Sequence, residues 1–236
     1  MKTATTTKTT NKRLGLLSSG LALLLASFGA SAAGGNLLVN GSFEDIGGAA
    51  LQGWGGYTFG AGYSDTLAGW TISSGSVDVT VTGSAWGAAQ DGVHSLDLNG
   101  WESGVLSQQL QTQIGQSYQV SFAFSRNASG APDPAIALVT AGNAALQLSA
   151  PNDAGRFGSP YAMKWEQAGF QFTATEALTT LSFSASVPGN GGVYLDAVSV
   201  TALTAAPVPE PESYALMLAG LAAVGFIARR RGVARS

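Results

Sequence analysis

Hydrophobic and polar residues alternate with a period of two in several short runs of this chain. The clearest runs are residues 76–82 (SVDVTVT) and 117–125 (SYQVSFAFS). Such alternation sends apolar side chains to one face of a β-strand and polar side chains to the other. Between residues 33 and 203, no segment repeats its apolar residues at the 3.6-residue spacing of a helix. Further strands are expected at residues 95–98, 105–110, 135–139, 169–173, 178–185 and 193–200.

Many short strands separated by glycine-rich turns predict an all-β domain over residues 33–203, a jelly-roll sandwich of two packed sheets. Residues 47–62 are rich in glycine and aromatic residues, and we expect them to form one long loop. Trp70 and Trp165 stand in strand-like segments, so we expect both indoles in the core.

The N-terminal end has the pattern of a secretory signal peptide. A basic stretch ending at Arg13 precedes an apolar run over residues 14–28, and Ala30-Ser31-Ala32 supplies the small residues of a cleavage site. We therefore expect residues 1–32 to be removed on export.

The C-terminal end has three parts in a fixed order. Pro209-Glu210-Pro211 is followed by an apolar run over residues 214–228 and then by Arg229-Arg230-Arg231. Prolines keep the triplet extended, and the arginines hold their end of the run in the cytoplasm. The order resembles the PEP-CTERM sorting signal. The resemblance implies a linker over residues 204–213, a transmembrane helix with a basic tail over residues 214–236, and cleavage at the triplet by an exosortase. A plain tail anchor is the alternative.

Charge is distributed unevenly along the chain. The whole chain carries 11 Lys and Arg against 14 Asp and Glu, but eight of the bases lie in the two end segments. Residues 33–212 keep three bases and all 14 acids, a net charge of −11. Such a surface repels phosphate backbones, so we expect no nucleic acid partner. The chain has no cysteine, which excludes disulfides, thiol nucleophiles and thiolate metal sites.

A second resemblance covers nearly the whole exported domain. Its order of motifs is similar to the choice-of-anchor C family of PEP-CTERM proteins, to plant cell-wall proteins with a domain of unknown function, and to galactose-binding-like carbohydrate-binding modules. One departure is Ala197, which stands where related sequences often have Asn. The motifs that carry the resemblance are residues 36–44 (NLLVNGSFE), 67–72 (LAGWTI), 75–79 (GSVDV), 91–100 (DGVHSLDLNG), 104–110 (GVLSQQL) and 192–200 (GVYLDAVSV).

The resemblance implies a galactose-binding-like jelly roll whose first and last strands lie close together. Similar modules hold a structural calcium ion there, which points to Glu44 and Asp196 as candidate ligands, with Asn40 and Asp45 as further oxygen donors. Calcium takes six to eight hard oxygen ligands, and no local motif supplies them. The alternative is that both carboxylates accept backbone hydrogen bonds or face solvent.

Exposed aromatic side chains are the other candidate chemistry, because sugar rings stack on indole and phenol faces. The candidates are Trp54, Tyr57, Trp86 and Trp101, which lie in glycine-rich breaks between the predicted strands. Packing within the core or the loops is the alternative for each of them.

No catalytic motif stands out, and His94 is the single histidine. We therefore expect a non-enzymatic protein, exported through the inner membrane, membrane-anchored before processing, and then held at the cell surface or in the extracellular matrix. The predicted function is carbohydrate binding to exopolysaccharide or cell-wall glycan. A structural matrix or biofilm protein is the alternative, and a glycan-active hydrolase is the least favoured. Converging aromatics would favour binding, and scattered ones a structural role.

Overall fold

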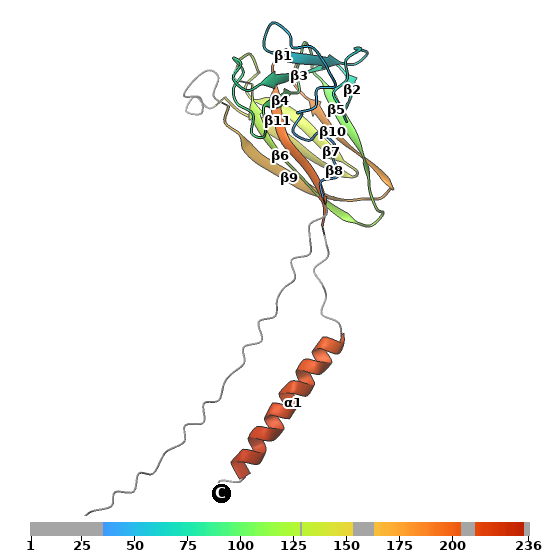
Figure 1. The fold of residues 1–236 in the computed structure, drawn as a ribbon, viewed down its shortest axis with the longest axis vertical. Coiled ribbons are helices and arrows are strands. Elements are labelled where there is room, and N and C mark those ends of the chain that lie inside the picture. The colour runs from blue at the N-terminus through green and yellow to red at the C-terminus, as the bar shows by residue number, and fades with distance from the viewer. Residues whose placement is uncertain (1–34, 128, 153–162, 204–210, 234–236) are drawn as a thin grey trace, which may run out of the picture. The chain divides into compact units, whose positions relative to one another are not determined.

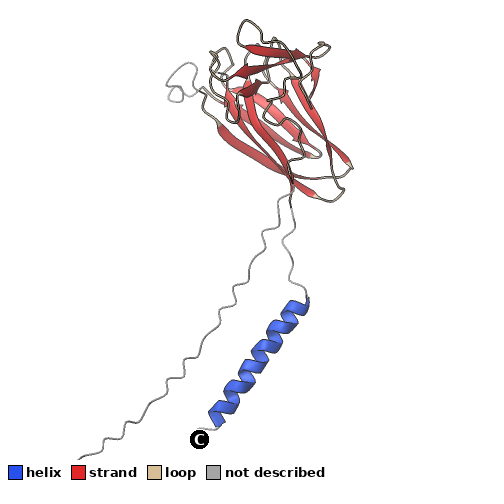
Figure 2. Cartoon of the chain, viewed as in Figure 1, coloured by secondary structure: helices blue, strands red, loops and turns tan. Residues whose placement is uncertain are grey.

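The computed structural model describes residues 35–127, 129–152, 163–203 and 211–233. The predicted signal peptide and most of the predicted linker, including Pro209 and Glu210, lie outside these residues. The first three ranges contain eleven strands, and the last is the helix α1 (Pro211–Val233). Figure 2 shows the strands in red and the helix in blue. No helix within the described part of the chain has the length and hydropathy that a membrane crossing requires. The transmembrane assignment of residues 214–236 therefore stays a prediction.

The strands form a sandwich of two antiparallel sheets, which confirms the predicted fold class (Figure 1). Successive strands repeatedly change sheets, as in a jelly roll. The six-stranded sheet has the order β1 (Gly56–Gly60), β3 (Ser76–Val81), β4 (His94–Asp97), β11 (Val193–Ala202), β6 (Ser117–Arg126) and β9 (Glu166–Thr173). The five-stranded sheet has the order β2 (Thr71–Ser74), β5 (Val105–Gln111), β10 (Leu178–Ala185), β7 (Ala135–Ala141) and β8 (Ala144–Ala150).

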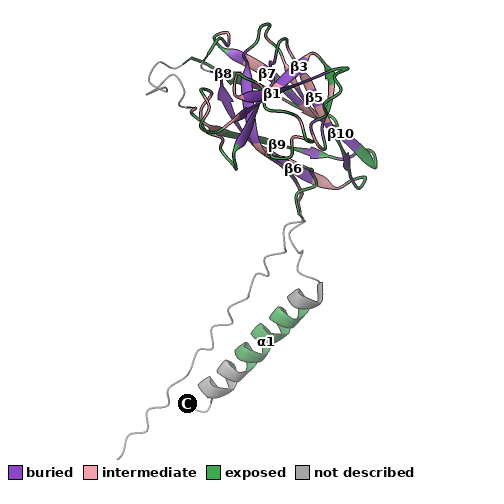
Figure 3. Ribbon diagram, turned by 45° about the horizontal axis from the view of Figure 1, so that its top comes forward, coloured by how far each residue is buried: buried purple, intermediate pink, exposed green. Residues whose placement is uncertain are grey.

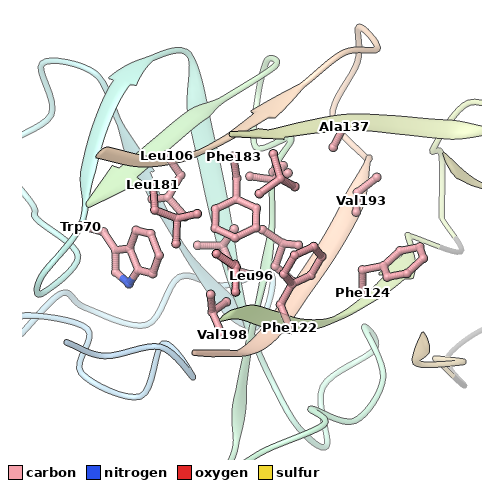
Figure 4. Close-up of a cluster of buried hydrophobic side chains, with 14 of the residues drawn as sticks. Trp70, Leu96, Leu106, Phe122, Phe124, Ala137, Leu181, Phe183, Val193 and Val198 are labelled. Atoms are coloured by element: carbon pink, nitrogen blue, oxygen red, sulfur yellow. The ribbon is translucent and has the colours of Figure 1, made fainter. Parts of the chain in front are cut away.

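The core lies between the sheets, where the apolar positions of the alternating runs meet. Phe122 of β6 and Phe183 of β10 are fully buried and pack edge to face, with ring centroids 5.4 Å apart (Figure 4). Burying a side chain of this size stabilises a fold by about 1.5–3 kcal/mol. All buried hydrophobic residues of the described chain lie between Leu38 and Val200. Residues 35–203 therefore contain a complete core, and we expect this segment to fold on its own.

Two expectations for the N-terminal half need correction. Residues 47–62 do not form one long loop, because Gly56–Gly60 is strand β1, paired with β3. The composition was misleading because Gly56 and Gly60 leave room for the rings of Trp54 and Tyr63, which pack directly over them. Trp70 is in the core as expected, whereas Trp165 is only half-buried.

Strand β4 of the six-stranded sheet is buried along its whole length, whereas β9 at the edge of that sheet has several exposed positions (Figure 3). Asp97 of β4 and Tyr194 of β11 lie on the face opposite the core residues Leu96 and Leu195, yet they are at most 2% exposed. The connection between β3 and β4 crosses this face, since the N–H groups of Gln90 and Asp91 in that connection donate to Asp196 Oδ2 on β11. Asp97, Tyr194 and Asp196 on the outer face are therefore held away from bulk water.

Candidate tryptophan pocket

Three of the four predicted glycan-binding aromatics line one pocket of about 210 Å³ at the β1–β3 end of the sandwich. Trp54 precedes β1, Trp86 lies between β3 and β4, and Trp101 lies between β4 and β5. The other lining residues are Asp78 in the middle of β3, Gly100 and Asn190. We call this site the tryptophan pocket.

Trp54 and Trp86 form one corner of the pocket. Their ring centroids are 6.1 Å apart and the ring planes cross at 80°. Trp86 donates from Nε1 to the carbonyl of Trp54 at 3.0 Å, and Trp54 donates from Nε1 to Gln52 Oε1 at 2.7 Å. Because Gly56 has no side chain, the Trp54 ring lies against the backbone of β1. Both indoles are therefore fixed before any ligand arrives.

Trp101 combines a fixed backbone with an exposed side chain. Its N–H donates to Ser76 Oγ at 2.8 Å, and the N–H of Gly100 donates to the Ser76 carbonyl at 2.9 Å. The side chain is 67% exposed. A large, exposed indole on an anchored loop is a suitable platform for a sugar ring.

Asp78 is the charged group of the pocket. It lies on the outer face of β3, where Thr58 of β1 donates to its Oδ1 at 2.7 Å. Gly100 is so close that a Cβ there would lie 3.0 Å from the same oxygen. Burial raises the pKa of Asp78 from its usual 3.8 to about 6, although the Thr58 hydrogen bond lowers it in part. Neither Asp78 nor Asn190 is among the site residues predicted from the sequence. An Asp inside a strand of β-branched residues was the available signal, because Asp is depleted in strands.

Asp97 lies beside Asp78 but does not line the pocket. It is 1% exposed, and three groups donate to its carboxylate: Asn127 Nδ2 at 2.6 Å, the N–H of Asn99 at 2.9 Å and the N–H of Gly192 at 3.3 Å. Burial raises the pKa of Asp97 to about 7 against these hydrogen bonds. Its role in the structure is to hold the chain segments at the base of the pocket together.

Tyr57, the fourth predicted aromatic, is not brought to this pocket. Trp54 and Asp78 lie on the outer face of the six-stranded sheet, whereas the Tyr57 ring is partly buried against the core on the inner face. The Tyr57 ring also packs edge-on against His94, with ring centroids 5.8 Å apart. Alternation along β1 explains the difference, because Thr58 is the residue that faces Asp78.

Glu44 and Asp196, the predicted calcium ligands, both hold the segment that leads into β4. Glu44 Oε1 accepts from the N–H groups of Val93 at 2.8 Å and His94 at 2.9 Å. Asp196 Oδ2 accepts from the N–H groups of Gln90 at 2.7 Å and Asp91 at 3.0 Å. Both carboxylates thus accept hydrogen bonds from the backbone of the same segment, residues 90–94.

These contacts do not fit a calcium site, because N–H donors face the carboxylates where calcium needs six to eight oxygen ligands. Asn40 and Asp45 bond to each other, since Asn40 Nδ2 donates to the Asp45 carbonyl and the Asp45 N–H donates to Asn40 Oδ1. Within the described residues, no group of three or more His, Cys, Asp and Glu side chains could hold a metal ion. Calcium binding stays a prediction.

His94 is also accounted for by this arrangement. It is 9% exposed, and its Nδ1 lies 3.3 Å from Glu44 Oε2. The carboxylate partner is occupied by backbone donors, and the ring is covered by Tyr57. These contacts give His94 a structural role at the start of β4.

A second pocket, of about 340 Å³, lies at the turns from β7 to β8 and from β9 to β10. Its lining includes Asn143, Glu176 and Thr180 and no aromatic residue. It therefore lacks the stacking surfaces that distinguish the tryptophan pocket.

Comparison with known proteins gives two family matches. The family described as "Protein of unknown function (DUF642)" matches residues 36–200, and the PEP-CTERM protein-sorting motif matches residues 207–231. These confirm the predicted sorting signal and the resemblance to proteins with a domain of unknown function. Membership in the choice-of-anchor C family stays a prediction.

The chain is also similar to a much longer protein and to several solved structures. It is 31% identical over 170 residues to halomucin of Haloquadratum walsbyi, covering 70% of this chain and only 2% of halomucin. The structure of TmCBM61 in complex with beta-1,4-galactotriose matches with a TM-score of 0.46 and 12% identity, over 71% of this chain and 99% of that one. The CBM22-1 xylan-binding domain from Paenibacillus barcinonensis Xyn10C matches with a TM-score of 0.38 and 19% identity, over 66% and 100% of the chains.

Proposed function

Because the chain belongs to the DUF642 family and carries a PEP-CTERM sorting motif, we propose that it is an exported, exosortase-sorted protein that binds carbohydrate in the tryptophan pocket. After processing it is held at the cell surface or in the extracellular matrix, where exopolysaccharide or cell-wall glycan is its partner. Before processing it is anchored in the membrane.

The observation that carries this proposal is the convergence of three indoles from separate loops on one pocket. A purely structural matrix protein has no need to gather Trp54, Trp86 and Trp101 around a carboxylate. Indoles offer an apolar face to the C–H groups of a sugar, while Asp78 and Asn190 offer polar partners to its hydroxyl groups. This is the mixture of stacking and hydrogen bonding that carbohydrate recognition uses.

The same geometry favours binding over hydrolysis. Glycosidases use two carboxylates that flank the bond to be cut. Asp78 lines the pocket, but its neighbour Asp97 is 1% exposed and holds three hydrogen-bond donors. The pocket thus presents one carboxylate to a ligand where hydrolysis requires two.

The proposal is tested by measuring the binding of residues 35–203 to a panel of polysaccharides. Affinity electrophoresis and pull-down are suitable methods. We expect weak binding, with a Kd of about 0.1–1 mM, or about −4 to −5.5 kcal/mol. A small pocket makes few contacts with a glycan, and part of their free energy is lost in ordering the ligand. Tighter binding is therefore not expected. Trp101→Ala should remove most of the binding and leave the melting temperature nearly unchanged, because the side chain is 67% exposed.

Tyr63→Ala is the matched control, since Tyr63 is an aromatic residue that is 50% exposed and lies outside the pocket. If both variants lose binding equally, the effect comes from exposed aromatic residues in general and not from the tryptophan pocket. If the unmodified domain binds no polysaccharide, the binding function is rejected and the structural matrix role is favoured.

A further inference from the structure

The tryptophan pocket contains an acid but no base. Its lining residues are Trp54, Asp78, Trp86, Gly100, Trp101 and Asn190. Across the described ranges, His94 and Glu44 form an ion pair, and Asp78 forms none. Arg126 directs its guanidinium to the carbonyls of Ala131 and Pro132. A ligand that enters the pocket therefore meets a carboxylate that no cation among the described residues pairs with.

Burial makes the negative charge of Asp78 unfavourable, and the hydrogen bond from Thr58 of β1 offsets this only in part. Asp97 of β4 stands directly opposite Asp78 in the strand register. Beyond Asp97 lies Tyr194 of β11, and burial raises the pKa of that phenol, with smaller contributions from Asp97 and Asp78. The titratable neighbours on adjacent strands are thus acids. A positive charge in the pocket would stabilise the ionised form of Asp78.

The indoles favour the same kind of charge. The face of an indole carries negative electrostatic potential and attracts ammonium groups within about 6 Å of the ring. Trp54 and Trp86 meet at 80°, so they form two perpendicular walls of a corner. Such a corner suits a compact group better than a flat pyranose ring, which stacks on a single open face. Trp101 provides that open face at the pocket.

We propose that the tryptophan pocket selects sugars that carry a free, positively charged amine, as in a de-N-acetylated amino-sugar polymer. The ammonium group sits between Trp54, Trp86 and Asp78, and the ring stacks on Trp101. The proposal rests on the carbohydrate-binding function and names the ligand class of the same site. The net charge of −11 on residues 33–212 acts in the same direction, because it attracts a polycationic chain over a longer range.

The test compares three trisaccharides by isothermal titration and NMR on residues 35–203 at pH 7: the β-1,4-linked glucosamine trimer, its fully N-acetylated form, and cellotriose. We expect the amine form to bind at least about tenfold more tightly than the other two, which corresponds to 1.4 kcal/mol. The N-acetylated trimer is the direct control, because it has the same ring and linkage without the charge. The preference should shrink as the pH falls through about 6, where Asp78 takes up a proton.

Asp78→Asn should lower the affinity for the glucosamine trimer to that of the N-acetylated trimer. Glu102→Gln removes one exposed charge beside Trp101 but outside the pocket lining, and it should leave the preference intact.

If Asp78→Asn does not fold, the pH dependence of the unmodified domain decides. Equal affinity for the amine and N-acetyl forms, or a preference that persists below pH 5, overturns the amine proposal while carbohydrate binding stands. Failure to bind any carbohydrate rejects the binding function itself.

Discussion

Asp78 on β3 and Asp97 on β4 are direct cross-strand partners on the outer face of the six-stranded sheet. Like charges in this position repel each other, and Asp97 is buried while Asp78 is partly buried. Burial raises the pKa of Asp78 to about 6 and that of Asp97 to about 7. On β11, burial also raises the pKa of Asp196 to about 6. The sandwich thus contains three acids that retain protons to a higher pH when folded than when unfolded.

We expect the free energy of unfolding to fall as the pH rises from about 4 to about 7. In that range the unfolded chain has released these protons, because its aspartates titrate near 3.8, while the folded chain still holds them. Each such group lowers stability by at most about 1.4 kcal/mol per pH unit until its folded-state pKa is passed. Urea unfolding of residues 35–203 between pH 4.5 and 8 measures the slope.

Asp97→Asn is the informative variant for this prediction. It removes the group that titrates at the highest pH, so the decline between about pH 6 and 7 should flatten, whatever the variant does to absolute stability. A stability that is constant or rises between pH 5 and 7 in the unmodified domain would contradict the burial argument.

Ala197 is a site where a substitution should stabilise the domain. Its φ of 50° lies in the left-handed region, at the point where the register of β11 shifts against β6. A non-glycine residue there costs roughly 1–2 kcal/mol, and Asn tolerates the conformation better than Ala. We therefore expect Ala197→Gly and Ala197→Asn each to raise the free energy of unfolding by about 0.5–1 kcal/mol.

Ala202→Gly, at the regular end of the same strand, is the control for that result. It should lower stability by up to about 0.5–1 kcal/mol, because Ala202 is regularly paired with Tyr118 and glycine loses more conformational freedom on folding than alanine. Destabilisation by Ala197→Gly of the same size would mean that the left-handed conformation at residue 197 is not under strain.

Glu44→Gln should destabilise the fold by about 1–3 kcal/mol. Oε1 of Glu44 accepts two backbone hydrogen bonds and Oε2 faces His94, and hydrogen bonds to a charged acceptor are stronger than those to a neutral one. Chemical denaturation checks the size of the loss.

Melting curves with calcium and with EDTA separate the two roles considered for this carboxylate. A structural calcium ion at hundredfold excess over its Kd would add about 2.7 kcal/mol, and Glu44→Gln would abolish the gain. The hydrogen-bonded arrangement predicts the same melting temperature in calcium and in EDTA. A calcium-dependent rise that Glu44→Gln removes would establish the metal site.

The sorting motif gives a prediction independent of the sandwich. Replacing Pro209, Glu210 and Pro211 with alanines should leave the protein unprocessed in the membrane, because the extended recognition segment is lost while residues 214–231 are unchanged. Mass spectrometry of the mature protein and membrane fractionation measure this. Processing identical to that of the unmodified protein would reduce the signal to a plain tail anchor.

Strict alternation was enough to locate the central strands. Residues 76–82 and 117–125 correspond to β3 and β6, with Val77, Val79 and Phe122 in the core as their positions predict. Strands β1, β2 and β8 lack such strict alternation and are not among the predicted strands. In β1, glycine is required by a ring that packs over the backbone, so its composition resembles that of a loop. In β8, alanines weaken the contrast between the two faces.

The candidate site was predictable in its chemistry but not in its assembly. Exposed tryptophans in glycine-rich breaks indicated stacking, yet Trp54, Trp86 and Trp101 come from three loops that only the strand order brings together. Asp78 occupies a polar position of an alternating strand, where an Asp is uncommon, but its role depends on which loops cover that face. Sequence spacing carries no information on such contacts between distant segments.

The most direct measurement of carbohydrate binding in the tryptophan pocket uses the indole N–H signals of the protein's five tryptophans in a ¹H–¹⁵N NMR titration. Binding at a Kd of about 0.1–1 mM gives fast exchange, so each signal reports its own contact with the added glycan. If the tryptophan pocket binds the glycan, the signals of Trp54, Trp86 and Trp101 shift together. The signals of Trp70, in the core, and Trp165, outside the pocket, stay in place. Shifts confined to Trp165, or no shift with any glycan that the protein retains, would contradict binding in the tryptophan pocket.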